Sequence, residues 1–334
     1  MSQALAAGRR LSSGVAWHSP LLFLAALMAV TGLVSLIGLV VDPRELVGSP
    51  AWAKPLKFSI SFVLYALTLS WLIGQVTSAR RLAWWLGTTA AVAVVVEMII
   101  IVGAVLADTT SHFNVTTSLS SALWSIMAVS IIVLWLASLI VGILLFRVKD
   151  ADPARSTAIR AGVVLGLTGM ALGFLMTAPT AAQLDDWQGI SGAHTVGAAD
   201  GGPGLFLLGW STVAGDLRVP HFVGMHALQL LPIGAILLEA AALRVAVLES
   251  SLVRRRIVRV VAVLYAAVLA VLTLQAIMGQ SVVRPSADIA LASVALVLLA
   301  GVSIAVILAH GRRSGPSRPA PSPPATRAAA GGSA

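Results

Sequence analysis

The residue types best suited to chemistry gather in one segment, residues 216–229, which holds an aspartate, an arginine, two histidines and a glutamine. Pro220 favours a helix that begins there and places His221 and His226 in its first turns. At ~100° per residue the two rings lie about 140° apart around the helix axis. They therefore bind one metal ion together only if the helix is distorted.

A kink is expected just below these histidines. Pro232 cannot donate a hydrogen bond to the Leu228 carbonyl oxygen, which is left without its helical partner. His226 and Gln229 are three residues apart in the sequence and lie near one face of the helix. Broken helix geometry at membrane depth must be satisfied by protein or by a wet cavity, so this region is expected to be polar.

Carboxylates also occur inside long apolar runs. By the helical rise, Glu97 lies about 16 Å below Asp108. The spacing between them is close to three full turns, so the two side chains project within about 20° of the same direction from the helix axis. Glu239 lies in a later run, nominally on the face of His221. A carboxylate exposed to lipid is costly, so both glutamates are expected inside the bundle. The structural alternatives are a neutral Glu97 bonded to a nearby Ser, Thr or Gln, and a Glu239–Arg244 pair.

Basic residues supply a site for an anion. Two of the three lysines, Lys54 and Lys57, are three residues apart in a chain that otherwise uses arginine. Their ammonium groups could capture an anionic headgroup or a carboxylated ligand. Salt bridges to acids such as Asp185 or Asp216 are the structural alternative.

These residues together predict one site at the outer end of a helix bundle. The candidate catalytic residues are Glu97, Asp108, His112 and His226. The candidate substrate contacts are Lys54, Lys57, Asn114, Arg218 and Gln229. The candidate metal ligands are His112, His221, His226 and Asp216. A metal-dependent membrane enzyme is one function for such a site.

The residue types resemble those of the seven-span ceramidase and adiponectin-receptor hydrolases, which bind zinc through histidines with Ser and Asp contacts near one end of the bundle. The resemblance covers only the idea of the site, and it implies a zinc hydrolase. The His-x-x-x-His motif of that family is absent, because four residues separate His221 from His226. Ser111 directly precedes His112, which also differs from that pattern.

Three other functions fit the same residues. A haem-binding electron-transfer protein would use His226 and a histidine from another segment as axial ligands. A proton-coupled transporter would use Glu97 and Glu239 along a path through the bundle. A non-catalytic lipid-binding protein would need none of these groups for chemistry. The cofactor prediction stays open between a metal ion, haem and none.

The elements that must position these groups are membrane-spanning helices. Hydrophobic residues form 58% of the chain and charged residues 10%, a composition typical of hydrocarbon surroundings. Barrel strands would be shorter and alternating, so the prediction is an all-α, polytopic transmembrane bundle. Eight runs approach or exceed the roughly 20 apolar residues that cross a bilayer: 21–41, 56–76, 82–107, 119–146, 158–181, 221–246, 257–279 and 289–309.

The basic residues predict the orientation in the membrane. Of the 22 Lys and Arg residues, 17 fall in the N-terminal arm, in alternate loops and in the tail. The positive-inside rule then places both termini in the cytoplasm and the protein in the cell membrane. The net charge of +9 lies in short loops, which indicates anionic inner-leaflet lipid, not nucleic acid, as the partner. The preference for arginine over lysine suggests GC-rich codons and a bacterial source.

The chain is expected to contain one membrane domain. Residues 1–20 are predicted as a cytoplasmic arm, 21–310 as the bundle and 311–334 as a disordered tail. The extracytoplasmic loop 182–220 is long enough to be functional, either as a cover over the bundle or as an interfacial segment, and the cover is preferred.

Small residues in one span predict a helix contact. Gly162, Gly166, Gly169 and Gly173 form one stripe that lets another helix approach closely. A hinge is the functional alternative for these glycines. The chain has no cysteine, which excludes disulfides, thiol catalysis and Cys-ligated metal sites.

Overall fold

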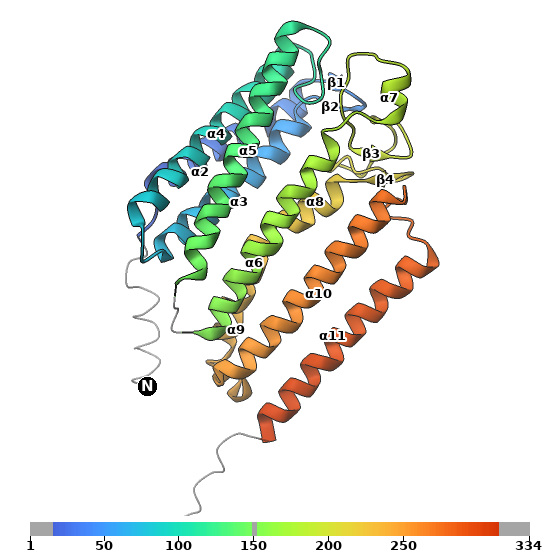
Figure 1. Cartoon of the computed structure of the whole chain (residues 1–334). Helices are drawn as coiled ribbons and strands as arrows, with labels where there is room; N and C mark the ends of the chain where they lie inside the picture. The colour runs from blue at the N-terminus through green and yellow to red at the C-terminus, as the bar shows by residue number, and fades with distance from the viewer. Residues whose placement is uncertain (1–15, 149–151, 314–334) are drawn as a thin grey trace, which may run out of the picture.

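The computed structural model describes residues 16–148 and 152–313 and is an all-α bundle. Eight helical segments are long and apolar enough to cross a membrane, which confirms the predicted number (Figure 1). The long helices are α2 (Ser19–Val41), α3 (Ala53–Gln75), α4 (Arg80–Leu106), α5 (Ser118–Phe146), α6 (Pro153–Leu172), α8 (Arg218–Met225) with α9 (Ala227–Ala241), α10 (Ser251–Ile277) and α11 (Ala287–Arg313). Most of the predicted arm and tail, 1–15 and 314–334, lies outside the described residues.

Short elements gather at the end of the bundle where α7 (Ala181–Asp185) lies (Figure 1). Here β1 (Glu45–Leu46) pairs antiparallel with β2 (Ser49–Pro50), and β3 (Thr195–Val196) pairs antiparallel with β4 (Gly215–Asp216). We call this end the loop end. One turn of 3₁₀ helix, η1 (Gly173–Met176), leads into it, and another, η2 (Ala246–Glu249), lies at the opposite end.

Local sequence signals fix several helix starts. The Thr117 hydroxyl and the Ser120 hydroxyl each accept from the other's backbone N–H, which closes a capping box at the start of α5. Asp152 accepts from the Ala154 N–H and precedes a proline at the start of α6. The His18 ring caps α2 by accepting from the Leu21 N–H. These caps set where each span leaves its loop.

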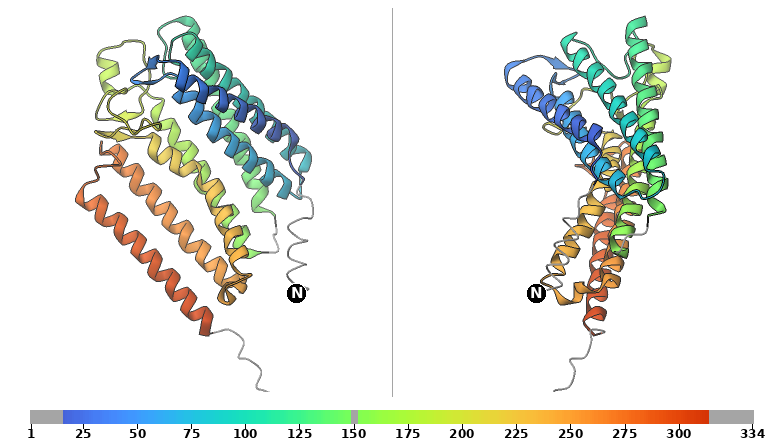
Figure 2. Two further views of the ribbon diagram at one scale, coloured as in Figure 1. Left: turned by 180° about the vertical axis from the view of Figure 1, so that it is seen from behind. Right: turned by 90° about the vertical axis from the view of Figure 1, so that its left-hand side faces the viewer.

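The spans pack in two groups. α2 lies against α3, and α4 packs on α3 and α5; together they form the largest core, with Leu21 and Leu72 at most 1% exposed. α6 packs on α8, α9 and α10, and α11 lies outside α10 (Figure 2). Contact between α5 and α6 joins the groups. Large apolar side chains cover the outer faces of the bundle, as expected where lipid is the solvent.

The glycine stripe of α6 lies under α8 and α9. A Cβ on Gly169 would lie 2.1 Å from the Gly224 carbonyl carbon, and one on Gly162 would lie 2.9 Å from the Ala227 carbonyl oxygen. Glycine therefore allows the backbones to approach more closely than any side chain would permit. The stripe is occupied by helices of the same chain.

The helix after the long loop is interrupted at His226. The sequence predicts a helix start at Pro220 and a bend caused by Pro232. In the structure α8 begins earlier, at Arg218, and α9 runs through Pro232. The interruption lies at His226, between α8 and α9. A proline disturbs the helical turn before itself, and here the break lies N-terminal to that turn.

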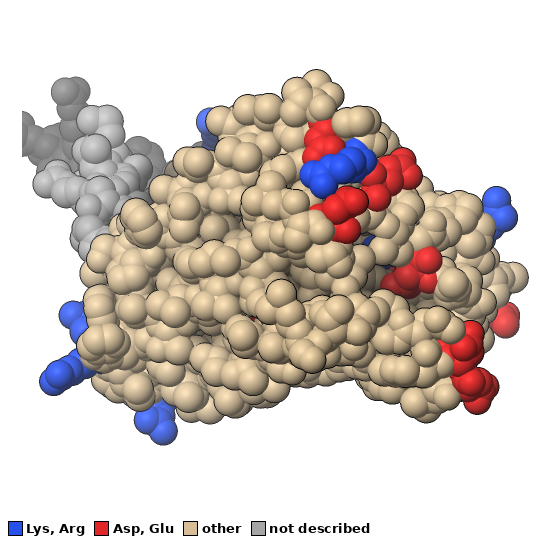
Figure 3. Space-filling model, turned by 90° about the horizontal axis from the view of Figure 1, so that it is seen from above, with Lys and Arg blue, Asp and Glu red and all other residues tan. Residues whose placement is uncertain are grey.

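Acidic groups gather at the loop end, onto which Figure 3 looks directly. Arg44 is a basic residue among them, and it contacts two of these acids, Asp42 at 2.7 Å and Asp108 at 3.3 Å. Most of the described arginines lie at the opposite end, chiefly in the terminal turns of the helices there. The two ends of the bundle therefore differ in charge as the sequence predicts.

Glu239 faces α6 at the end opposite the loops. Its carboxylate forms an ion pair with Arg155, whose Nε lies 3.1 Å from Oε1. The predicted pair with Arg244 is therefore wrong, because α9 packs on α6 and brings Arg155 to the carboxylate. Asp152 and Arg254 form a second ion pair at this end, at 2.6 Å.

Replacing Gly169 by alanine is expected to destabilise the bundle. The added methyl group would meet the α8 backbone at 2.1 Å, so the helices must separate, at a cost of about 1–3 kcal/mol. The thermal melting temperature of the detergent-solubilised protein measures this loss. Gly234→Ala in α9 is the matched control, because no described atom of another segment lies within 4 Å of a Cβ there. Equal melting temperatures for the two variants would contradict the close packing.

Candidate functional site

Three cationic side chains from two spans lie together at the loop end. Lys54 and Lys57 occupy the first turns of α3, and Arg218 is the first residue of α8. Lys54 interacts electrostatically with both other cations, and Lys57 also interacts with Arg218. All three side chains are partly buried. We call these residues the cationic cluster; the mutual repulsion of its charges must be offset by nearby negative groups or dipoles.

Three hydrogen-bond donors converge beside Gly209. The position of a Cβ on this glycine would lie 3.6 Å from Lys57 Nζ, 3.6 Å from Ser49 Oγ and 3.7 Å from Arg218 Nη1. Gly209 has a φ of +67°, a left-handed conformation that glycine adopts without strain. These three groups, an ammonium, a guanidinium and a hydroxyl group, therefore border the space beside the Gly209 α-carbon. We call this position the cradle.

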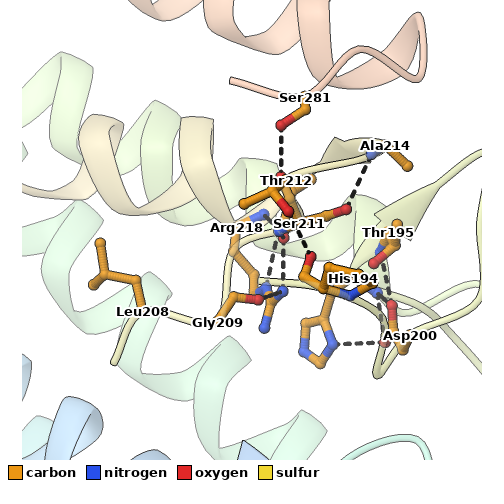
Figure 4. Close-up of polar contacts among 12 residues, drawn as sticks. His194, Thr195, Asp200, Leu208, Gly209, Ser211, Thr212, Ala214, Arg218 and Ser281 are labelled. Carbon is orange, nitrogen blue, oxygen red and sulfur yellow. Dashed lines mark hydrogen bonds and ion pairs between the residues drawn. The ribbon is translucent and has the colours of Figure 1, made fainter. Parts of the chain in front are cut away.

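Backbone carbonyl groups of the long loop hold two of the cations. Lys57 Nζ donates to the Leu208 carbonyl oxygen at 2.9 Å, and Arg218 Nη2 donates to the Gly209 carbonyl oxygen at 2.6 Å. Figure 4 shows Arg218 beside Gly209. Arg218 also forms an ion pair with the buried Asp216 at 2.6 Å. The loop therefore folds over the end of the bundle and contributes its own peptide groups to the cluster.

Lys54 and Lys57 have no carboxylate partner within hydrogen-bonding range among the described residues. Lys54 lies over the Phe58 ring at 5.9 Å, and within residues 16–148 and 152–313 neither Lys54 nor Lys57 forms a salt bridge. The predicted alternative, in which the lysines pair with Asp185 or Asp216, is not formed, because Asp216 contacts Arg218. Two ammonium groups are thus left for another negative group.

Glu97 lies inside the bundle within electrostatic range of Lys54. Its side chain is 0% exposed, and neither carboxylate oxygen has a hydrogen-bond partner among the described residues. The hydroxyl of Ser59 on α3 is also buried without a partner there. The expected hydrogen bond from Glu97 to a Ser, Thr or Gln is therefore absent from the described part of the chain. A carboxyl group in this state is costly as an anion.

His194 and Asp200 form a polar pair within the long loop. His194 Nδ1 lies 2.7 Å from Asp200 Oδ2, and the same carboxylate accepts from the Thr195 backbone N–H at 2.9 Å. Burial raises the pKa of Asp200, but the hydrogen bonds from His194 and Thr195 outweigh it and lower the pKa below its usual range. Burial lowers the pKa of His194, against the opposing effect of Asp200.

This pair could act in proton transfer. The His194 and Arg218 side chains point to the same side of the loop (Figure 4), and they interact electrostatically. An aspartate that fixes the ring through Nδ1 leaves Nε2 to accept a proton from a bound group, which is the geometry of a general base.

His112 lies among aromatic rings close to the cluster. Its ring centroid is 5.8 Å from that of Phe58 and 5.5 Å from that of Trp124. Burial lowers the pKa of His112 well below its usual value, and the positive charges of Lys54 and His194 lower it further. A neutral ring is therefore expected near neutral pH. The structure places His112 near Lys54 and His194. The sequence predicted that His112 and Lys54 share a site, but it did not include His194.

Asp108 and Asn114 are not part of this site. Asp108 follows α4 in a left-handed conformation, its side chain is 66% exposed, and it contacts Arg44. The Asn114 amide donates to the Thr109 hydroxyl at 3.1 Å and accepts from the Thr116 backbone N–H at 3.1 Å. Asp108 lies at the surface, whereas Asn114 is buried, and both hold loop segments in place. The proposed roles in catalysis and in substrate contact have no support from these positions.

Among the remaining predicted residues, His221 and Gln229 contact backbone carbonyl groups, whereas His226 does not. His221 Nδ1 donates to the Gly169 carbonyl oxygen at 2.8 Å. The Gln229 amide lies against the carbonyl oxygens of Met225 and His226 on its own helix. The His226 ring packs on a phenylalanine, and its Nε2 is buried without a partner in the described chain. Haem ligation by His226 stays a prediction.

The predicted metal ligands are not assembled. No three His, Cys, Asp or Glu side chains in 16–148 and 152–313 lie close enough together to hold a metal ion. Among the predicted ligands His112, His221, His226 and Asp216, three already have hydrogen-bond or ion-pair partners: His112 with Ser111, His221 with Gly169 and Asp216 with Arg218. The geometry does not provide the predicted metal centre.

Sequence reasoning missed Ser49, His194 and Asp200 as members of a site. Ser49 lies in a two-residue strand, and the other two lie in a glycine-rich loop. Loops lack the periodicity that places helix residues on a face. The available signal was a histidine and an aspartate close together in a long loop, which did not indicate where either would point.

Comparison with protein-family models, with curated proteins and with solved structures gives no match to this chain. The interpretation of the site therefore depends on its geometry.

Asp200→Asn is expected to loosen the long loop. The amide accepts weaker hydrogen bonds than the carboxylate, so amide hydrogen exchange over residues 194–200 should accelerate by about tenfold or more, as for the loss of ~1.5–3 kcal/mol per charged hydrogen bond. Because the pKa of Asp200 is lowered on folding, this stabilisation is present above about pH 4 and is lost as the pH falls through the folded-state pKa.

The matched control is Asp185→Asn, the same change at an exposed carboxylate of the same loop. Equal exchange rates in both variants and in the wild type would show that Asp200 does not hold the loop closed.

Proposed function

We propose that this chain is a multi-pass membrane protein that binds an anionic ligand, a phosphate-type or carboxylate oxyanion, at the extracytoplasmic end of its bundle. The cradle is the binding position, and the long loop is its cover. The membrane location follows from the eight apolar helices, and the ligand class follows from the charges that they position.

The convergence of three donors at Gly209 carries the proposal. Lys57 Nζ, Arg218 Nη1 and Ser49 Oγ come from α3, α8 and a hairpin, and they border the space beside the Gly209 α-carbon. An ammonium, a guanidinium and a hydroxyl group are the donors that oxyanions prefer in proteins. Their low-dielectric surroundings strengthen each interaction.

The charge balance supports an external anion. Asp216 neutralises Arg218, and the hydrogen bonds of Asp200 go to His194 and Thr195. Lys54 and Lys57 retain no ion pair in the described chain, while loop carbonyl groups contribute only partial charges. An anion in the cradle would relieve the repulsion between the cations and would replace a weak partner by a full charge.

An acid–base membrane enzyme is the second candidate, and the His194–Asp200 pair favours it. A ligand held by the cationic cluster would lie on the side of the loop to which the His194 ring points. The ring could then remove a proton from water or from the ligand. A binding protein or carrier returns its ligand unchanged, whereas an enzyme alters it.

We also propose that both termini lie in the cytoplasm and that the arginine-rich end contacts anionic inner-leaflet lipid. The chain has no cysteine, so single cysteines report on orientation directly. Gln188→Cys at the loop end should react with a membrane-impermeant maleimide in intact cells. Glu249→Cys, an exposed residue at the opposite end, should react only after permeabilisation. The reverse pattern would overturn the orientation.

Anion binding is tested by calorimetric titration of the purified protein with inorganic phosphate, acetate and sulfate. We expect binding that weakens at least about tenfold in Lys57→Gln, since a charged hydrogen bond contributes ~1.5–3 kcal/mol. Gly209→Ala should weaken it as well, because the methyl group fills the cradle. Arg284→Gln is the matched control, since Arg284 is an exposed cation at the loop end outside the cluster.

A second arm of this experiment identifies the source of the anion. Protein in nanodiscs of phosphatidylcholine is compared with protein in nanodiscs that contain phosphatidylglycerol. Competition between this lipid and free phosphate indicates a headgroup site, and its absence indicates a soluble ligand. Mass spectrometry of the phosphatidylglycerol recovered after incubation with the protein shows whether the lipid is unchanged, as for binding, or altered, as for turnover. Equal affinities in the wild type, Lys57→Gln and Gly209→Ala would refute the cradle.

A further inference from the structure

The long loop carries two apolar side chains at the turn that borders the cradle. Phe206 is 97% exposed and Leu207 is 40% exposed; we call these two residues the apolar tip. They directly precede the two residues whose carbonyl oxygens hold cations of the cationic cluster. A single exposed apolar side chain is ordinary on a protein surface. The setting of the apolar tip therefore decides what its exposure means.

Hydrogen bonds within the turn fix the apolar tip in its exposed position. The Leu205 backbone N–H donates to the Trp210 carbonyl oxygen at 2.8 Å, and the Leu205 carbonyl oxygen accepts from the Gly209 N–H at 2.7 Å. Leu207 has a φ of +62°, a left-handed conformation that is strained for a bulky side chain. Strained backbone of this kind persists only where its surroundings hold it, and it is concentrated at ligand sites. The turn thus presents the Phe206 ring to the outside.

The cations beside the apolar tip lie at the level of lipid headgroups. Lys57 lies in the first turns of α3 and Arg218 is the first residue of α8, and both helices are membrane-spanning segments. The ends of such segments lie where hydrocarbon gives way to the headgroup layer. Lipid phosphates occupy this layer and attract cationic side chains. The apolar tip is hydrogen-bonded through its neighbours to both cations, so it lies at the same level.

A second exposed apolar side chain and a free donor border the same place. Val47, in the turn between β1 and β2, is 54% exposed. Its Cγ1 lies 3.2 Å from the position of a Cβ on Gly201, so this hairpin contacts the long loop. The hydrogen bonds of Arg218 use Nε and Nη2, which leaves Nη1 for a ligand in the described part of the chain. Apolar side chains and unused cationic donors thus occur side by side, as an anionic amphiphile requires.

We propose that the ligand of the cradle is an anionic phospholipid, whose phosphate contacts Lys57, Arg218 and Ser49 and whose acyl chains lie against the apolar tip. The inference rests on the proposed function and deepens it, because it names the class of ligand. A soluble oxyanion would use the donors only and leave the Phe206 ring in water. A phospholipid uses both parts of the site: charge-assisted hydrogen bonds hold its phosphate, and burial of the ring stabilises its chains.

Competition in nanodiscs tests the contact with the acyl chains. Binding of inorganic phosphate is measured by calorimetry in phosphatidylcholine nanodiscs that contain increasing fractions of phosphatidylglycerol. Phe206→Ser should bind phosphate as the wild type does in pure phosphatidylcholine. It should need about tenfold more phosphatidylglycerol to halve that binding, as for the loss of one buried aromatic side chain. Leu184→Ser is the matched control and should behave as the wild type, because Leu184 is a 66% exposed residue of the same loop outside the apolar tip.

A spin label locates the apolar tip directly. The chain has no cysteine, so Phe206→Cys carries a single nitroxide. In nanodiscs this label should collide more often with dissolved oxygen, which concentrates in hydrocarbon, than with a water-soluble nickel chelate. Gln188→Cys, at an exposed polar residue of the same loop, should show the reverse preference.

The outcomes separate the lipid from the anion site. Equal competition by phosphatidylglycerol in the wild type and Phe206→Ser, no competition in either, or a label at position 206 that prefers the nickel chelate would overturn the lipid ligand and leave the anion site standing. Absence of phosphate binding by the wild type in phosphatidylcholine would remove the proposed function itself. Phe206 is almost fully exposed, so serine removes no packing contact, and the retained phosphate affinity reports that the variant is folded.

Discussion

Peptide carbonyl groups of a long loop hold Lys57 and Arg218, and the organisation of the loop end depends on this interaction. Buried cations without counter-ions are unstable in an apolar bundle. A carboxylate supplied by the chain would have filled the site permanently. Carbonyl dipoles stabilise a cation less strongly, so Lys57 is hydrogen-bonded yet open to a stronger partner, whereas Arg218 also forms an ion pair with Asp216. The same contacts draw the loop over the bundle, so closure of the loop and readiness for an anion have one physical cause.

Glycine residues allow the close packing at the loop end in two places. At Gly169 and Gly224 the absence of side chains brings α8 against α6, and this contact positions the start of α8, where Arg218 lies. At Gly209 a positive φ turns the carbonyl toward Arg218 while leaving the cradle unfilled. Gly169 and Gly224 thus set the packing of α8 on α6, and Gly209 sets the shape of the site. A side chain at either place would alter the geometry of the cationic cluster.

The sequence predicts the spans well because burial in lipid imposes a composition that a single run of residues displays. It also makes Lys54, Lys57, Arg218 and Glu97 candidates for a site, since charges near apolar runs are conspicuous. It misplaces Asp108 because helical periodicity no longer applies once the chain leaves α4, where Asp108 adopts a positive φ. It misses Ser49 and His194 because hairpin and loop residues are positioned by distant contacts. Glu239 pairs with Arg155 because α9 packs on α6. The spacing of residues along one helix does not predict such a contact.

The depth of Glu97 distinguishes a carrier from a surface receptor. A receptor needs donors at the loop end only, and a buried acid beneath them would reduce its stability for no gain. In a carrier, the charge of an anion must be compensated as it passes through the apolar bundle. A carboxyl group in its neutral form adds no negative charge at the point where solvation is poorest. Glu97 lies on α4, and the helices that pack on α4 contain only three ionisable residues: Lys54, Lys57 and Tyr65. This position fits the requirement of a carrier better than it fits a purely structural role.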